Sequence, residues 1–177
     1  WNKKFEYPTS IRSSVEGKRH YEITGQKLPS VTTILSATQS AEKKAKLAEW
    51  KQRVGTQQAD RIRDVSAMRG TAMHTYLEGY ILGKNHLDLT SIGREAERMA
   101  KVVIESGLGD LEEVWGSEVT LYYPGLYAGA TDVVGMYAGK PAIIDFKQTN
   151  KPKQREWIED YFVQLAAYAM AHNQVYD

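Results

Sequence analysis

The sequence contains no cysteine. This absence excludes disulfides, zinc–thiolate sites and cysteine-ligated iron–sulfur clusters, and it fits a reducing compartment. The chain also lacks an uninterrupted run of about 18 apolar residues, so we expect no transmembrane helix and no membrane partner. The first ten residues, WNKKFEYPTS, do not show the apolar centre of a signal peptide.

The chain has almost no net charge, +1 at pH 7, so composition alone does not predict a nucleic-acid partner. The distribution of charge is more informative. Eight basic and four acidic residues lie between Glu42 and Arg69, both included, and Lys147, Lys151, Lys153 and Arg155 follow one another with no acid between them. Each cluster has an ordinary interpretation as a solvated surface. Together they indicate a surface that binds phosphates.

The hydrophobic pattern predicts helices first, then strands, then a last helix. With 177 residues and 42% hydrophobic residues, the chain is long enough for one domain with a core. Residues 20–35 predict a hairpin around Gly25, followed by Ser30 as the N-cap of a short helix. Helical spacing predicts helices over 40–54, 57–82, 91–106 and 156–173. Alternation predicts an antiparallel meander of strands over 113–123, 127–137 and 141–147, which indicates an α/β or α+β fold.

The strand predicted over 141–147 ends in Asp145-Phe146-Lys147. Residues two apart in a strand point to the same face, so the carboxylate of Asp145 and the ammonium of Lys147 are expected to lie side by side. Asp132 falls within the preceding strand, and Glu118 within the strand before it. Clustered carboxylates repel one another unless a cation joins them. The all-oxygen donor set therefore predicts a Mg²⁺ or Mn²⁺ site that hydrolyses a phosphodiester, with Lys147 orienting the attacking water or stabilising the developing charge.

The last predicted helix carries two apolar stripes. We expect the first to be buried; it contains Ile158, Phe162, Leu165 and Ala169. The second contains Trp157, Tyr161, Gln164 and Tyr168. Aromatic side chains usually pack in a core, but a glutamine within an aromatic stripe needs a polar partner if it is buried. Aromatic rings accompanied by one polar group also suit unstacked nucleobases.

Each of these motifs has an ordinary structural interpretation when taken alone: a surface ion pair for Asp145 and Lys147, a strand-end residue for Asp132, and a solvent-facing residue for Glu118. Their order along the chain is more specific. From Pro29 to Tyr168 the sequence resembles the PD-(D/E)XK nuclease superfamily, in particular its RecB-like exonuclease branch. The motifs that carry this resemblance are Gly70-Thr-Ala-Met-His74, Glu118, Gly129-Ala-Thr-Asp132, Ile144-Asp-Phe-Lys147 and Gln164-Leu-Ala-Ala-Tyr168.

Two further stretches, residues 28–35 and 145–153, resemble the mitochondrial genome maintenance exonucleases and their phage and bacterial relatives. The absence of cysteine also favours this group, because other relatives carry a four-cysteine iron–sulfur cluster. The resemblance implies a restriction-endonuclease-like α/β core with a central mixed β-sheet, an antiparallel meander, flanking helices and an N-terminal helical arch. We expect one domain over 1–177, in which 1–110 are mostly helical and clamp DNA, and 111–177 form the catalytic sheet and its following helix.

The resemblance implies a role for each matching residue. Asp132, Asp145 and the backbone carbonyl of Phe146 would bind the metal, and Glu118 would lie beside it. Lys147 would be the catalytic lysine. His74 would be a helical metal ligand, although a lone histidine on a helix is more often a structural residue. The residues expected to contact DNA are Ser30, Thr32, Thr33, Gln148, Lys151, Gln164 and Tyr168.

The expected function is therefore a Mg²⁺- or Mn²⁺-dependent exonuclease acting on single-stranded or frayed DNA in replication, recombination or repair. We expect a monomer that works beside a recombinase or helicase, in the cytoplasm of a bacterial or phage-infected cell, or in mitochondria if the source is eukaryotic. Two alternatives stay open. One is a catalytically silent nucleic-acid-binding module, and the other is a structure-specific endonuclease of the same superfamily.

Overall fold

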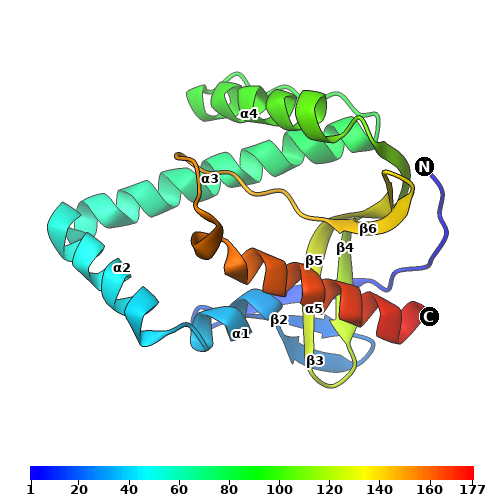
Figure 1. Cartoon of the computed structure of the whole chain (residues 1–177), viewed down its shortest axis with the longest axis horizontal. Helices are drawn as coiled ribbons and strands as arrows, with labels where there is room; N and C mark the ends of the chain where they lie inside the picture. Colours follow the sequence, from blue (N-terminus) through cyan, green and yellow to red (C-terminus); the bar gives the residue numbers. More distant parts are fainter. The chain divides into compact units, whose positions relative to one another are not determined.

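The computed structural model describes all residues, 1–177, and has a mixed α/β composition. Two three-stranded antiparallel sheets and five α-helices make up the chain (Figure 1). The contacts divide the chain into two compact units. We call residues 1–36 with 108–177 the sheet unit, and residues 37–107 the helical unit. None of the helices combines the length and the apolar character needed to cross a membrane.

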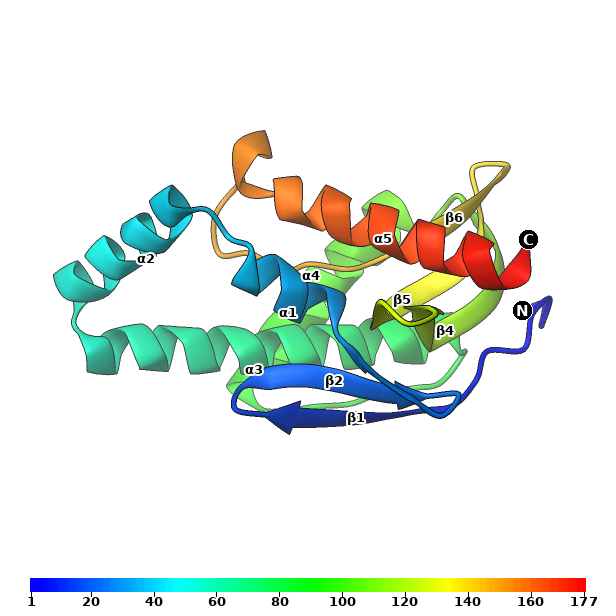
Figure 2. The ribbon, with the colours of Figure 1, turned by 90° about the horizontal axis from the view of Figure 1, so that it is seen from below.

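The first sheet of the sheet unit consists of β1 (Ser10–Val15), β2 (Lys18–Ile23) and β3 (Gln26–Pro29), with each strand antiparallel to the next (Figure 2). The hairpin predicted around Gly25 is confirmed, and Gly25 has the positive φ (+76°) that its tight turn needs. The strand β1 was not predicted, because most of its side chains are exposed and show no apolar alternation.

The second sheet is the predicted meander, formed by β4 (Leu111–Tyr123), β5 (Tyr127–Tyr137) and β6 (Lys140–Ile144). The prediction was wrong about where the third strand ends, since β6 stops at Ile144 and not at Lys147. The ladder ends there because the backbone N–H of Phe146 donates to the carboxylate of Asp132. Asp145 and Lys147 therefore follow the strand in an extended segment.

A single central mixed sheet was expected, and this expectation was wrong. The strands form two separate antiparallel sheets, joined by one parallel bridge between Ser30 and Ala128. The bridge cannot continue into a ladder, because α1 (Val31–Ala37) begins directly after Ser30 and turns the backbone into a helix.

The last helix, α5 (Glu159–Tyr176), follows the short 3-10 helix η1 (Arg155–Trp157) and packs on the second sheet (Figure 1). In the core between them, Tyr168 and Ala171 of α5 pack with Trp115, Leu121 and Val134 of the sheet. Burial of this apolar surface stabilises the unit by roughly 25 cal/mol per Å².

The prediction of which side of α5 is buried was wrong. Phe162, which we expected in the core, is 51% exposed, and Ala169 is exposed as well. The buried residues are Gln164, Tyr168, Ala171 and His172. Apolar residues occur on both sides of this helix, so periodicity could not identify the side that faces the sheet.

The helical unit contains α2 (Ala41–Val54), α3 (Thr56–Ile81) and α4 (Ser91–Gly107), each within two residues of its prediction. Within this unit α3 and α4 lie side by side (Figure 1). Arg69 is only 8% exposed, and its guanidinium donates to Glu95 of α4 at 2.9 Å, which joins the two helices. The helix α2 buries none of its side chains.

Candidate metal centre

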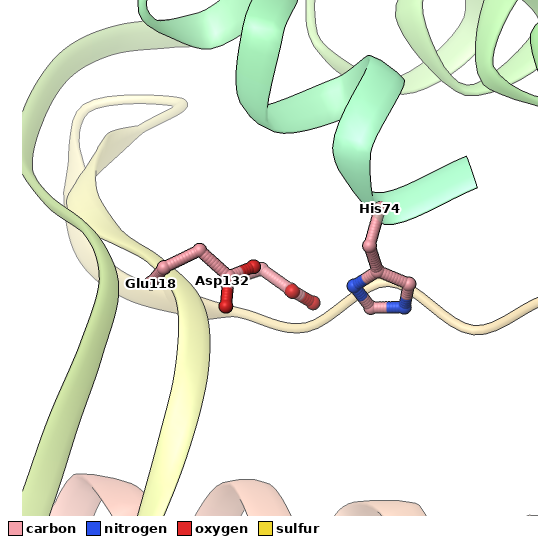
Figure 3. Close-up of side chains that lie close together, drawn as sticks. All are labelled: His74, Glu118 and Asp132. Carbon is pink, nitrogen blue, oxygen red and sulfur yellow. The ribbon is translucent and has the colours of Figure 1, made fainter. Parts of the chain in front are cut away.

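Glu118 of β4 and Asp132 of β5 lie opposite each other in the second sheet. The paired residues on either side, Ser117 with Val133 and Val119 with Thr131, fix this position. Directly opposed residues of antiparallel strands place their side chains on the same face. The carboxylate oxygens of Glu118 and Asp132 accordingly lie within 4.8 Å of each other (Figure 3).

The backbone of Glu118 has an unusual conformation, with a φ of +52° in the middle of a strand. This left-handed region disfavours ordinary L-residues by about 1–2 kcal/mol. Register shifts in the ladder occur just before it, between Leu111 and Glu113 and between Val114 and Gly116. Such irregularities redirect side chains next to active sites. Backbone strain that brings an acid to a second acid, where charge repulsion also opposes it, is typical of a functional site.

Asp132 is buried, and its position is fixed by the segment that follows β6. Its Oδ2 accepts the backbone N–H of Phe146 at 2.5 Å. Thr131 supplies a second connection, because its hydroxyl donates to the carbonyl of Ile144 at 3.1 Å. These two bonds set the direction of the chain as it enters Asp145.

Asp145 and Lys147 form an ion pair between the Lys147 ammonium and Asp145 Oδ2. The side chain of Asp145 is 9% exposed and that of Lys147 is 36% exposed. The Lys147 ammonium also lies 5.5 Å from the centre of the Tyr161 ring of α5, within the range of a cation–π interaction. The expectation that the Asp145 carboxylate and the Lys147 ammonium lie side by side is thus confirmed. Both residues lie in an extended segment after β6 and not in the strand itself.

Tyr168 and Gln164 of α5 are buried beside these carboxylates. Gln164 Nε2 donates to the Tyr168 hydroxyl oxygen at 2.8 Å, which gives the buried glutamine its polar partner. Burial raises the pKa of Tyr168, and the negative charges of Asp145 and Asp132 raise it further. The Tyr168 phenol is therefore neutral at physiological pH and lies within electrostatic reach of both acids.

Gly129 makes room for Tyr168. A Cβ on Gly129 would overlap the Tyr168 ring and lie 2.7 Å from its hydroxyl oxygen. Two of the predicted motifs, the glycine three residues before Asp132 and the tyrosine four residues after Gln164, are thus parts of one packing arrangement. The sequence indicated both motifs but not their contact.

The predicted DNA-contacting residues fall into two groups. The first is near α1: Ser30 is buried and its Oγ accepts the backbone N–H of Thr33 at 3.0 Å, so its predicted N-cap role is confirmed. Thr32 is exposed. The second group lies after β6, where Gln148 is half-buried and Lys151 is exposed.

Contact with DNA stays a prediction for both groups and for Gln164 and Tyr168. At 3% exposure, Tyr168 offers almost no ring surface to a stacking base. Its place beside the carboxylates favours a role in positioning them. Sequence reasoning placed Tyr161 in the aromatic stripe of the last helix but did not predict its contact with Lys147. It assigned no role to Thr131.

The sheet unit thus contributes three acids and one lysine to one region. Carboxylate oxygens are the ligands that Mg²⁺ and Mn²⁺ prefer, so Glu118, Asp132 and Asp145 fit a hard divalent cation. His74, the other predicted ligand, is a half-buried residue of α3 in the helical unit (Figure 3). Its role as a ligand stays a prediction.

Comparison with known proteins supports a relationship to nucleases. The chain is 29% identical over 182 aligned positions to a protein of Xenopus tropicalis named mitochondrial genome maintenance exonuclease 1. The alignment covers 96% of this chain and 50% of the relative, so the chain spans about half the length of that protein. No family model matches the chain. A chain similar to an exonuclease therefore carries an acid cluster that fits a divalent cation.

Proposed function

We propose that this protein is a divalent-metal-dependent deoxyribonuclease of the PD-(D/E)XK type that degrades DNA from its ends. The proposal rests mainly on one observation: the carboxylates of Glu118 and Asp132 lie close together, and the ion pair of Asp145 and Lys147 directly follows the neighbouring strand β6. The similarity to an exonuclease supports the same conclusion independently of this geometry.

Asp132 and Asp145 would hold the cation, together with the backbone carbonyl of Phe146, and Glu118 would bind it directly or through water. A bound Mg²⁺ or Mn²⁺ would lower the pKa of a water molecule and neutralise charge on the phosphodiester. The protein keeps Asp132 in place through the Phe146 N–H, so the carboxylate does not have to reorganise when the cation binds.

Lys147 would stabilise the negative charge that develops on the phosphate, or orient the attacking water. Its ammonium is a mobile point charge, and in the protein without substrate it is paired with Asp145. The ion pair with Asp145 and the Tyr161 ring keep the Lys147 ammonium beside the carboxylates that would hold the cation. A phosphate bound at this place would therefore be within reach of Lys147.

The substrate we propose is a single strand or a frayed end. Basic side chains are frequent in α2 and in the first half of α3, where most side chains are exposed. A protein surface that binds a single nucleic-acid strand along its backbone needs exposed basic side chains. The affinity of such a surface does not depend on base sequence.

The experiment that tests this proposal compares linear with circular single-stranded DNA of the same sequence, in Mg²⁺, in Mn²⁺ and in EDTA. We expect metal-dependent loss of the linear strand, survival of the circle, and no reaction by Asp145→Asn. Rapid cutting of the circle would replace the exonuclease with an endonuclease. Binding of both DNAs without cleavage in either metal would leave a nucleic-acid-binding module.

The His74→Ala variant tests the predicted ligand of the helical unit in the same assay. We expect its cleavage rate to fall and to recover in part at raised Mn²⁺ concentration, because a missing ligand weakens metal binding. An unchanged dependence of the rate on metal concentration would remove His74 from the site.

A further inference from the structure

A groove in the helical unit carries two arginines that no other side chain neutralises. The groove has a volume of about 620 Å³ and is lined by Leu89, Ser91, Arg94, Glu97 and Arg98. None of these residues belongs to the candidate metal centre. The guanidinium groups of Arg94 and Arg98 form no hydrogen bond or ion pair, and both residues are exposed.

The two arginines are four residues apart on α4, so they lie on the same face of the helix, about 6 Å apart along its axis. Each guanidinium presents a planar set of donors that matches the oxygens of a phosphate. Two such groups on one helix face can hold one phosphate together or two phosphates of a continuous strand.

The acids of α4 near these arginines have other partners. Glu97, the acid of the groove, pairs with Lys101 at 3.0 Å. Glu95 accepts from the buried guanidinium of Arg69 at 2.9 Å. The positive charge of Arg94 and Arg98 is therefore available to a ligand. The helical unit as a whole has twelve basic and nine acidic side chains, so its net charge has the same sign.

The start of α4 is held rigidly, which keeps the arginines in place. Asp88 Oδ1 accepts from the backbone N–H and the hydroxyl of Thr90, and Thr90 Oγ1 accepts the N–H of Gly93. The Tyr76 hydroxyl accepts the backbone N–H of Asp88 at 3.0 Å and so fixes this loop to α3. The groove therefore lies along α4 and the segment anchored in front of it.

We propose that this groove binds the phosphate backbone of a nucleic-acid strand. The two guanidinium groups would contact phosphates, and Leu89, which is 66% exposed at the same groove, would lie against a sugar or base. A combination of paired arginines with an apolar surface suits a nucleotide strand better than an isolated inorganic anion. The proposal rests on the proposed function, because it takes DNA as the ligand.

The test is fluorescence anisotropy of a labelled single strand in EDTA, where cleavage does not interfere. The variant is Arg94→Gln with Arg98→Gln, and the matched control is Arg12→Gln with Lys18→Gln. The control removes the same charge from β1 and β2, where neither side chain has a partner. Circular dichroism and thermal melting verify that both variants are folded.

Loss of two phosphate contacts should weaken binding about 25-fold at 0.1 M salt, and it should make the slope of log K against log salt concentration less steep by about 1.4. The control should retain the affinity and slope of the wild-type protein. Equal weakening in both variants, or no change in the groove variant, would overturn the proposal. Binding of an acidic peptide but not of DNA to the wild-type groove would instead assign it to a protein partner.

This assay separates the groove from the proposed nuclease activity. If the wild-type protein binds DNA through Arg94 and Arg98 but cleaves nothing in Mg²⁺ or Mn²⁺, DNA binding by the groove is supported and the nuclease proposal is wrong. If cleavage occurs and the groove variant binds DNA as tightly as the wild type, DNA binding by the groove is wrong and the nuclease proposal is supported.

Discussion

The acid pair of the second sheet predicts an unusual relation between stability and metal. The two carboxylate oxygens lie within 4.8 Å of each other, and two negative charges at that upper limit repel by about 1 kcal/mol in water and about 3.5 kcal/mol at an effective dielectric constant of 20. Glu118 is exposed, which favours the lower value. We therefore expect Glu118→Gln to raise the free energy of unfolding by about 1 kcal/mol when no divalent cation is present.

The same substitution should have the opposite effect in the presence of metal. A ligand at 100 times its dissociation constant stabilises a folded protein by about 2.7 kcal/mol, and the wild-type acids should provide this gain in full. The Glu118→Gln variant should gain less stability from metal, because a neutral amide replaces the carboxylate. The variant is thus expected to be the more stable protein in EDTA and to lose that advantage in Mg²⁺ or Mn²⁺.

The assay is chemical denaturation followed by circular dichroism, in EDTA and in increasing Mg²⁺ or Mn²⁺. Glu22→Gln, which removes an exposed acid from β2, is the control and should change stability by less than about 0.5 kcal/mol. Glu118→Asn should stabilise the metal-free protein by up to about 1 kcal/mol more than Glu118→Gln, because asparagine tolerates the left-handed backbone. If Glu118→Gln is less stable than the wild type in EDTA, or gains as much stability from metal, then repulsion between Glu118 and Asp132 does not destabilise the metal-free protein.

Three further outcomes are expected. Gly129→Ala should lower the free energy of unfolding by about 1–3 kcal/mol and reduce cleavage, because the new Cβ displaces Tyr168; equal melting temperatures would contradict this. Lys147→Ala should reduce the cleavage rate by about 10²–10³ with metal affinity nearly unchanged, and a calorimetric titration showing strongly weakened metal binding would count against its assigned role. Burial lowers the pKa of His172, which bonds the Tyr7 hydroxyl at 3.1 Å, so stability should fall as pH drops below 6.5 toward the lowered pKa. His172→Gln should flatten this part of the pH profile, and an identical slope would exclude His172 as its source.

The sequence predicted the helices and the meander well because their patterns are strong. The helix α4 has clear periodicity, glycine or serine marks the ends of the helices of the helical unit, and the strands β4 and β5 are long. The strand β1 escaped prediction since it is short and mostly exposed. The split into two sheets depends on where β3 turns into α1, which is a tertiary outcome that local patterns do not record.

The candidate site was predictable as a set of residue types but not as a geometry. The order of Glu118, Asp132, Asp145 and Lys147 indicated a metal site, and the structure brings the first two acids together. The left-handed backbone at Glu118 and the bond from Phe146 to Asp132 arise from the register and the end of the ladder. The sequence left open whether Gln164 and Tyr168 are buried, because α5 carries apolar residues on both sides.

The most direct test of the central claim is a time course on single-stranded DNA labelled at either end, with wild type and Asp132→Asn at equal folded concentration in Mg²⁺, Mn²⁺ and EDTA. We expect progressive shortening by the wild type in metal and none in EDTA, and the label that is lost first gives the polarity. We expect no shortening by Asp132→Asn, because Asp132 is the buried acid that joins β5 to the segment carrying Asp145 and Lys147. Shortening by Asp132→Asn at the wild-type rate, or by the wild type in EDTA, would contradict the central claim.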